Sequence, residues 1–240
     1  SFGSDLLLGG GSGQTAGARD DSYRWSSSTS FDYRNFERLK DREALRVNQA
    51  GPGHLHDLLD EWNIVTRLGF SVTPDLEVGL SDGWRSLRGR NVEEPSVLGQ
   101  AYRSDGFRDL EFDVRWRFRR QSPDGFPVDL AVFGSVKPPT GDTTERFPKP
   151  FDERIDAHLQ PGSGGTDGTL GLAASRRWGK WGSSGSVSDT TKGEGTQHFD
   201  PGDVLRVSMS GARQLSPDDW NWKAFASLGQ AALVFASAAL

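Results

Sequence analysis

The sequence of 240 residues contains no cysteine and a single methionine. Without cysteine the chain can build neither a disulfide framework nor a thiolate metal site. No uninterrupted apolar run approaches the roughly 20 residues of a membrane-spanning helix, which excludes a helical membrane protein. Only 34% of the residues are hydrophobic. A transmembrane β-barrel stays open as a class, because it needs an apolar side chain only at every second position.

Basic runs are also missing, and the formal net charge is −5, so we expect no nucleic-acid partner. The beginning, SFGSDLLLGGGSGQ, lacks the charged n-region and long h-region of a signal peptide, so an exported protein would have this sequence as its mature chain. Residues 1–21 are predicted to form a flexible periplasmic or plug segment, and residues 22–240 a transmembrane barrel. Thirty glycines and eight tryptophans suit a turn-rich β protein.

The most regular pattern in the chain is FRDLEFDVRWRFRR, residues 107–120. From residue 109 to residue 119 charged and apolar side chains alternate without exception, which is the two-residue period of a β-strand. In a soluble sandwich the apolar face forms the core and the ionic face meets water. In an outer-membrane barrel the apolar face meets lipid and the ionic face lines an aqueous lumen. One strand cannot separate these interpretations.

Alternation recurs along the chain and predicts nine strands, near residues 23–36, 62–72, 76–84, 107–120, 127–137, 167–178, 181–190, 205–215 and 220–228. Helical periodicity is limited to a turn or two in HLHDLLDEW. The connections alternate between short turns, at 73–75, 121–126, 179–180 and 216–220, and long polar loops, at 38–57, 89–106, 138–165 and 191–202. Outer-membrane barrels have this arrangement, with short periplasmic turns and long extracellular loops, whereas a Greek-key sandwich has no reason to keep one end short.

The positions of the tryptophans give a second test. Four of them flank short turns and are predicted to form an aromatic girdle at the membrane interface: Trp178, Trp181, Trp220 and Trp222. The apolar stretch 110–118 has the length of about 9–11 residues that a tilted membrane strand needs. We therefore predict that the apolar face of 107–120 is turned to lipid and its ionic face to water.

Two loop segments resemble a known family. FGSVKPPTGDTTERF (133–147) and LQPGSGGTDGTLGLAASRRWGKW (159–181) resemble the MetA-pathway phenol-degradation outer-membrane family, as do FDYRNFERL and LGFSVTPDLEVGLSDGW. The resemblance covers roughly residues 22–230 and implies an up-and-down antiparallel transmembrane β-barrel, an all-β fold of about 10–12 strands that passes small molecules. Two segments depart from the pattern, because 182–195 lacks branched and aromatic residues and AALVFASAAL does not alternate. It stays open whether the last strand or strands are missing or altered.

The ionic faces of the predicted strands supply the candidate functional residues. They are expected to line the lumen, where unpaired charges select solutes and cross-strand pairs stiffen the wall. The lumen residues are Glu61, Arg67, Arg85, Asp109, Glu111, Asp113, Arg115, Arg117, Arg119, Asp129 and Lys137. Arg108 is expected on the apolar face at its outer boundary, within reach of lipopolysaccharide phosphates.

A hairpin of 107–120 with 127–137, turning at 123–124, has paired residue numbers that sum to about 248. This register sets Arg119 opposite Asp129 and Glu111 opposite Lys137. The remaining charges, Asp109, Asp113, Arg115 and Arg117, are predicted to have no charged partner on that neighbouring strand and to be the residues that contact solute.

The chain offers little for catalysis. His54 and His56 form an H-x-H pair without a third ligand nearby, and the spacing of Ser188, His198 and Asp200 does not require a triad. We expect no enzyme, no metal and no cofactor. The leading hypothesis is a bacterial outer-membrane channel for small aromatic or polar solutes, in contact with lipid and lipopolysaccharide. The alternatives are a structural or ligand-binding barrel plugged by the 138–165 loop or the N-terminal segment, a barrel enzyme, and a soluble β-sandwich binding protein.

Overall fold

The computed structural model of the protein describes residues 24–36, 55–92, 98–122, 125–148, 153–179, 181–213 and 230–232. These residues form ten β-strands and two short 3₁₀ turns. The strands are β1 (Trp25–Asn35), β2 (Leu55–Ser71), β3 (Leu76–Val92), β4 (Leu98–Phe107), β5 (Glu111–Arg119), β6 (Asp129–Lys137), β7 (Asp167–Trp178), β8 (Trp181–Thr191), β9 (Val204–Arg213) and β10 (Gln230–Ala232), and the turns are η1 (Ala157–Leu159) and η2 (Thr196–His198). No described helix is long and apolar enough to cross a membrane.

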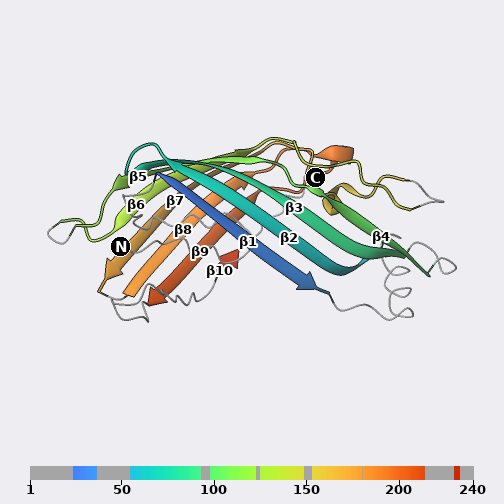
Figure 1. The fold of residues 1–240 in the computed structure, drawn as a ribbon, viewed down its shortest axis with the longest axis horizontal. Helices are drawn as coiled ribbons and strands as arrows, with labels where there is room; N and C mark the ends of the chain where they lie inside the picture. The colour runs from blue at the N-terminus through green and yellow to red at the C-terminus, as the bar shows by residue number, and fades with distance from the viewer. Residues whose placement is uncertain are drawn as a thin grey trace.

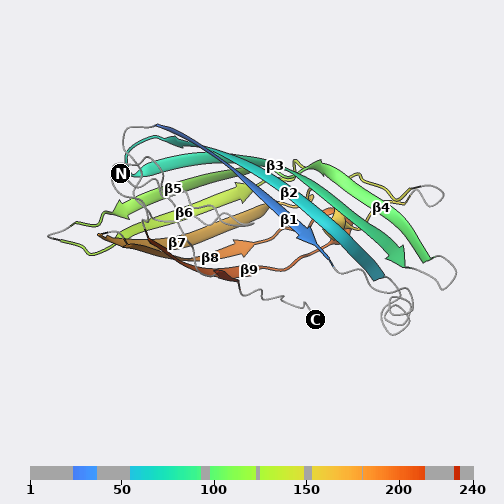
Figure 2. The same ribbon diagram turned by 60° about the horizontal axis from the view of Figure 1, so that its bottom comes forward.

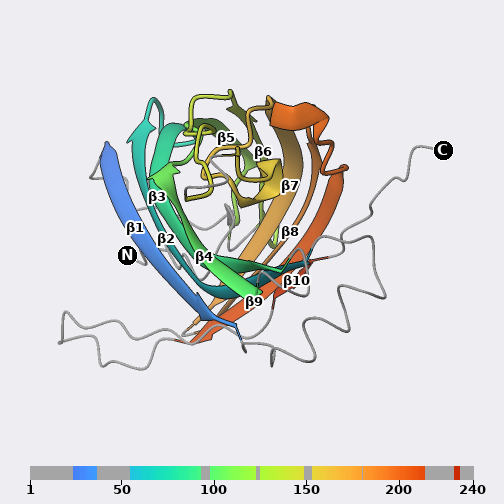
Figure 3. The same cartoon turned by 90° about the vertical axis from the view of Figure 1, so that its right-hand side faces the viewer.

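The strands form a single antiparallel sheet in the order β1-β2-β3-β5-β6-β7-β8-β9-β10, with β4 beside β3 (Figure 1). Apart from β4 and β5, which both pair with β3, strands that follow one another in the chain are neighbours in the sheet, as the predicted up-and-down connectivity requires. Seen end-on, the sheet is curled (Figure 3). The all-β antiparallel prediction is confirmed, and one curled sheet is not the pair of packed sheets of a sandwich.

The β3–β4 arm was not expected. The sequence predicts a long loop over 89–106, but β3 continues to Val92 and pairs with β4 through residues 84–92. The lower half of β3, residues 76–81, pairs with β5 instead. The arm reaches beyond the ends of β5 to β9 (Figure 2). The helical turn expected in HLHDLLDEW is also wrong, because β2 already begins at residue 55.

Pairing between β5 and β6 follows the predicted register over most of its length. Phe112 lies opposite Val136 and Arg117 opposite Ala131, so the paired numbers sum to the predicted value. The register then shifts at a bulge before Arg119, which lies opposite Leu130 rather than Asp129. That predicted charge pair is wrong.

Apart from 89–106, the described connections lie at the ends of the sheet that the alternation of their lengths predicts. Short turns join β2 to β3 and β7 to β8 at one end of the sheet, and the connection 138–166 lies at the other end (Figures 1 and 2). Seen end-on, the described residues of this connection, 138–148 and 153–166, run inside the curve of the sheet (Figure 3). We call the concave side of the sheet the inward face. The expected plug segment 1–21, the turn at 216–220 and the strand at 220–228 lie outside the described residues.

Candidate functional site

The inward face carries the charges and the opposite face carries the apolar side chains. On β5, Phe112, Val114 and Trp116 are 52%, 44% and 53% exposed. Asp113 and Arg117, which alternate with them, are each 7% exposed. The same inversion holds on the other long strands, where Phe31, Leu68, Val136, Leu170, Leu172 and Met209 are exposed. The predicted assignment of the two faces agrees with this burial.

A compact ion cluster lies on the inward face of β2, β3 and β5. The guanidinium of Arg67 donates two hydrogen bonds to Asp113, at 2.9 and 2.6 Å, and a third to Glu77 at 2.8 Å. A side chain at the paired positions Gly69 and Gly79 would occupy the same space. A Cβ at Gly79 would lie 2.4 Å from Asp113 Oδ1 and 2.6 Å from Arg67 Nη2. The two glycines therefore let the cluster lie flat on the sheet.

Arg85 joins the sheet to the long connection between β6 and β7. Its Nε donates to Glu61 at 2.9 Å, and its Nη1 donates to the backbone carbonyl oxygens of Gln160 at 2.8 Å and His158 at 3.4 Å. Glu61 also accepts a hydrogen bond from Asn63. Two predicted lumen residues, Glu61 and Arg85, thus hold a loop against the inward face.

Asp109 is the centre of a second cluster, at the start of the same connection. Its carboxylate accepts hydrogen bonds from Lys137 Nζ at 2.8 Å, from the backbone N–H of Gly141 at 2.8 Å, and from the N–H and Oγ of Ser163 at 2.8 Å each. Lys137 also pairs with Asp167 at 3.1 Å. Lys137 is therefore paired with Asp109 rather than with Glu111, and the expectation that Asp109 has no charged partner on β6 is wrong.

These contacts give a role to the loop motifs noted in the sequence. Lys137 and Gly141 belong to the first motif, and Ser163 and Asp167 belong to the second. All four gather around Asp109 or its lysine partner, and Gly162 packs directly on Gly141. The motifs therefore hold both ends of the connection 138–166 against the junction between β4 and β5.

A third cluster lies at the short-turn end of the sheet. Asp75, in the turn after β2, accepts hydrogen bonds from Arg117 at 3.0 Å and Arg120 at 2.7 Å. The Arg120 guanidinium, assisted by Arg117 and opposed by partial burial, holds the pKa of Asp75 below its ordinary value of 3.8. Arg117 therefore has a charged partner in the β2–β3 turn, whereas the prediction considered only partners on β6. Arg119 lies over the Phe126 ring, 5.1 Å from its centre.

Asp129 and Gln121 tie the β5–β6 turn to the end of β7. Asp129 is buried and accepts the backbone N–H of Gln121 at 3.0 Å. The Gln121 side chain in turn donates to the carbonyl of Arg177 and accepts from its N–H. Asp129 thus stabilises a turn rather than pairing with Arg119.

Hydroxyl side chains line the flanks of the inward face, and they were missed in the sequence. The burial and register of β8 and β9 place Ser184, Ser186 and Ser188 opposite Ser210, Ser208 and Arg206 on this face. Ser184 and Ser210 are hydrogen bonded at 2.6 Å, as are Thr169 and Thr190 at 2.9 Å. Strand β1 adds Ser26, Ser28 and Ser30. The serines at every second position from Ser184 to Ser188 are the sequence signal for this hydroxyl-lined face.

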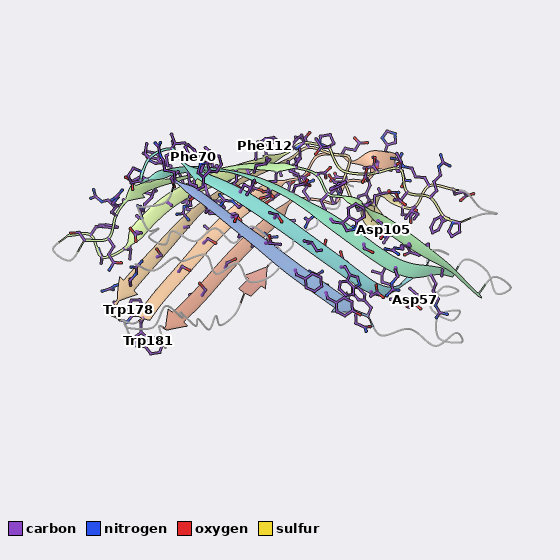
Figure 4. All side chains as sticks on the ribbon, in the orientation of Figure 1. Asp57, Phe70, Asp105, Phe112, Trp178 and Trp181 are labelled. Atoms are coloured by element: carbon purple, nitrogen blue, oxygen red, sulfur yellow. The ribbon has the colours of Figure 1, made fainter. Side chains whose placement is uncertain are left out.

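The tryptophan prediction is only partly covered by the described residues. Trp178 and Trp181 are 47% and 50% exposed and lie together at the β7–β8 turn, far from Asp57 and Asp105 at the long-loop end (Figure 4). This is the exposure that a girdle requires. Trp220 and Trp222 lie outside the described residues.

The connection 138–166 builds its own small core against the inward face. Phe147, Ile155 and Leu159 pack on Leu87 of β3 and Tyr102 of β4. The buried Gln160 side chain accepts from the N–H of Glu145 and donates to the carbonyl oxygens of Glu145 and Ile155. The 192–203 connection adds Gln197, whose side chain accepts from Ala157 N–H and donates to Ile155 O. The described part of the loop considered as a plug, 138–165, is therefore docked on the inward face of the sheet.

The histidine chemistry considered from the sequence finds no support in the described part of the chain. His198 is paired with Glu194 at 2.5 Å, on an exposed loop, whereas Ser188 lies on the inward face of β8. No group of three metal-ligating side chains comes together among the described residues. The side chains of His54 and His56 lie outside them.

Comparison of the chain with protein-family models gave no match, and comparison with curated proteins gave none either. The resemblance of its loop motifs to the phenol-degradation outer-membrane family therefore stays a prediction. The geometry of the sheet carries the functional argument by itself.

Proposed function

We propose that the protein is an outer-membrane β-barrel channel that passes small solutes along its charged and hydroxylated inward face. This proposal rests on one observation: along the strands the apolar side chains are exposed, whereas the charged side chains that alternate with them are buried. A soluble protein keeps exposed apolar patches small, and a larger one marks a surface for lipid or for a protein partner. Here the exposed apolar side chains alternate strand after strand with inward polar ones, which is the pattern of a lipid-facing barrel wall.

The inward wall is suited to polar solutes. Its central strands carry ion clusters that are largely neutralised within the sheet, and its flanks carry serine and threonine hydroxyls that both donate and accept hydrogen bonds. Neutralised charges bind a passing solute weakly, and hydroxyls replace part of its hydration. A polar solute can therefore pass along this inward face without being bound tightly to it.

A second candidate function is a barrel closed by its own loop. The docking of 138–166 on Arg85, Asp109 and the Leu87–Tyr102 patch favours it. In this case the protein is a structural or ligand-binding barrel, and the connection 138–166 blocks the passage of solutes through its lumen. The two candidates differ in whether the docked loop leaves a conducting path.

Recordings from the purified protein in planar lipid bilayers separate these functions. We expect stepwise conductance from the wild-type chain, and larger steps from Arg85→Gln, because this change removes the hydrogen bonds to Gln160 and His158 that hold the loop. Arg88→Gln is the matched control. Arg88 is exposed, and its partner is Asp60, at 2.6 and 2.8 Å.

A wild-type chain without steps, together with a conducting Arg85→Gln variant, would favour the plugged barrel. Absence of steps from both proteins would reject the channel. Equal effects of Arg85→Gln and Arg88→Gln would show that the loop contact does not control passage.

A further inference from the structure

Arg108 lies on the inward face, contrary to its predicted position. Inward side chains of β4 have even numbers, such as Tyr102 and Ser104, whereas inward side chains of β5 have odd numbers. The break at 108–110 joins these two alternations, so that Arg108 and Asp109 both turn inward. The arginine stem lies over Gly83, where a Cβ would be 3.2 Å from Arg108 Cδ and 2.5 Å from the backbone oxygen of Ile64.

The guanidinium of Arg108 makes no hydrogen bond or ion pair with any side chain in the described part of the chain. Burial disfavours its charge most strongly, Arg85 repels it, and Glu111, Asp109 and Glu61 attract it. Two of these three carboxylates already have other hydrogen-bond partners. Glu61 binds Arg85 and Asn63, and Asp109 binds Lys137, Gly141 and Ser163.

Glu111 is the third carboxylate, and within the described ranges its side chain likewise has no hydrogen-bond or ion-pair partner. It lies opposite Ser81 on β3, and the backbone N–H of Arg108 donates to Gly83 O at 2.8 Å. Ser81 and Gly83 are successive inward positions of one strand, about 6–7 Å apart. The positively charged Arg108 and the negatively charged Glu111 are thus attached to neighbouring positions of the inward face, and neither has a side-chain partner among the described residues.

We propose that Arg108 and Glu111 form a binding site for small zwitterionic solutes, which carry a carboxylate and an ammonium group as free amino acids do. The planar guanidinium binds a carboxylate through two parallel hydrogen bonds, and Glu111 accepts from the ammonium. This inference deepens the proposed channel function by naming the class of solute, and it rests on that function for its biological meaning.

The test measures binding rather than current. The full-length chain, folded in detergent, is dialysed to equilibrium against radiolabelled free glycine. We expect Arg108→Gln and Glu111→Gln each to weaken binding about tenfold, the loss that follows from one charge-assisted contact. Arg119→Gln at the other end of β5 and Glu153→Gln on the exposed loop are matched controls, and we expect wild-type binding from both. Acetate and methylammonium should each compete only weakly.

Free glycine that does not bind the wild-type chain, or binds Arg108→Gln equally well, would overturn the site. Acetate competing as well as glycine, with no effect of Glu111→Gln, would identify a simple anion site and overturn the zwitterion assignment. If tryptophan fluorescence shows that Arg108→Gln does not fold, the binding measurement uses Arg108→Lys and Glu111→Gln instead. A chain that binds free glycine but conducts no current would reject the channel and leave this site intact.

Discussion

Glycines on the inward face make room for charged and aromatic side chains. Gly79 accommodates the Arg67–Asp113 pair, Gly83 accommodates Arg108, and Gly171 lies under the ring of Phe133. In each case a Cβ would meet another atom at 3.2 Å or less. These glycines are required by close approach rather than by backbone conformation, because none of them has a positive φ angle.

Gly79→Ala should therefore destabilise the protein by roughly 1–3 kcal/mol, the usual result of overpacking, because the new methyl group displaces the Arg67–Asp113 hydrogen bonds. Urea unfolding in lipid vesicles, followed by tryptophan fluorescence, measures the change. Gly168→Ala is the control, since a Cβ at Gly168 meets nothing within 4 Å, and its effect should stay within about 0.5 kcal/mol. Equal losses from both substitutions would contradict the role of Gly79.

The Asp75 cluster predicts a pH dependence at the short-turn end. The pKa of Asp75 is lowered in the folded chain, mainly by Arg120. Its stabilising effect is therefore fully present above its ordinary value of 3.8 and is lost as the pH falls through the lowered value. The pairs are partly exposed, so Asp75→Asn should cost about 0.5–1 kcal/mol at pH 7 and nothing in strong acid. Unfolding curves of both proteins across this range test it, and a constant difference would refute it.

At the scale of elements, the connection 138–166 is fixed by a few buried polar anchors as well as by its small apolar core. Asp109 binds both of its ends, Arg85 binds its middle, and Gln160 joins its two arms. Three of the four anchoring contacts of Asp109 go to loop residues, Gly141 and Ser163. One side chain at the β4–β5 break therefore controls whether both ends of the connection stay docked.

Asp109→Asn should release this connection at a cost of roughly 2–3 kcal/mol, because hydrogen bonds to a charged acceptor are lost. Trypsin cleavage at Arg146 and Arg154 reports the release, and we expect it to be faster than in the wild-type chain. Asp189→Asn serves as the control, since Asp189 is an exposed carboxylate on β8. Unchanged cleavage of Asp109→Asn would contradict the anchor.

At the scale of the whole molecule, the curled sheet separates two environments. Its outer surface is a band of aromatic and branched side chains, and its inner surface carries ion clusters, hydroxyls and a docked loop. Such a sheet gains little by folding in water, because its apolar side chains stay exposed. The proposed membrane supplies the missing apolar environment for that face.

Val114→Lys tests this proposal directly. Val114 lies on the outer surface in the middle of β5, between Val78 and Gly134. A lysine that meets the centre of a bilayer should cost about 2–4 kcal/mol in lipid vesicles. Ser188→Lys, on the inward face of β8, should be tolerated. A Val114→Lys variant as stable as the wild-type chain would show that this surface does not meet lipid.

Much of the sheet could be read from the sequence because it depends on local alternation. The strict period of 109–119 is enough to assign the two faces of β5, and the turn at 123–124 is enough to set the register from Phe112 to Arg117. The bulge before Arg119 and the switch of alternation at 108–110 could not be read, since both depend on hydrogen bonds to neighbouring strands. The predictions for Arg108, Arg119 and Asp129 failed at these two points.

The sequence by itself determined an all-β antiparallel chain, the side of each strand that carries charge, and the end of the sheet that holds the long connections. These properties follow from side-chain periodicity and turn composition, which act over a few residues. Only the tertiary structure decided which charges pair. Arg67 binds Asp113, which is 46 positions away in the chain, and Arg85 binds a loop residue 75 positions away. Such partners are selected by the curvature of the sheet and by the room that glycines leave on it, and both arise only when the strands are assembled.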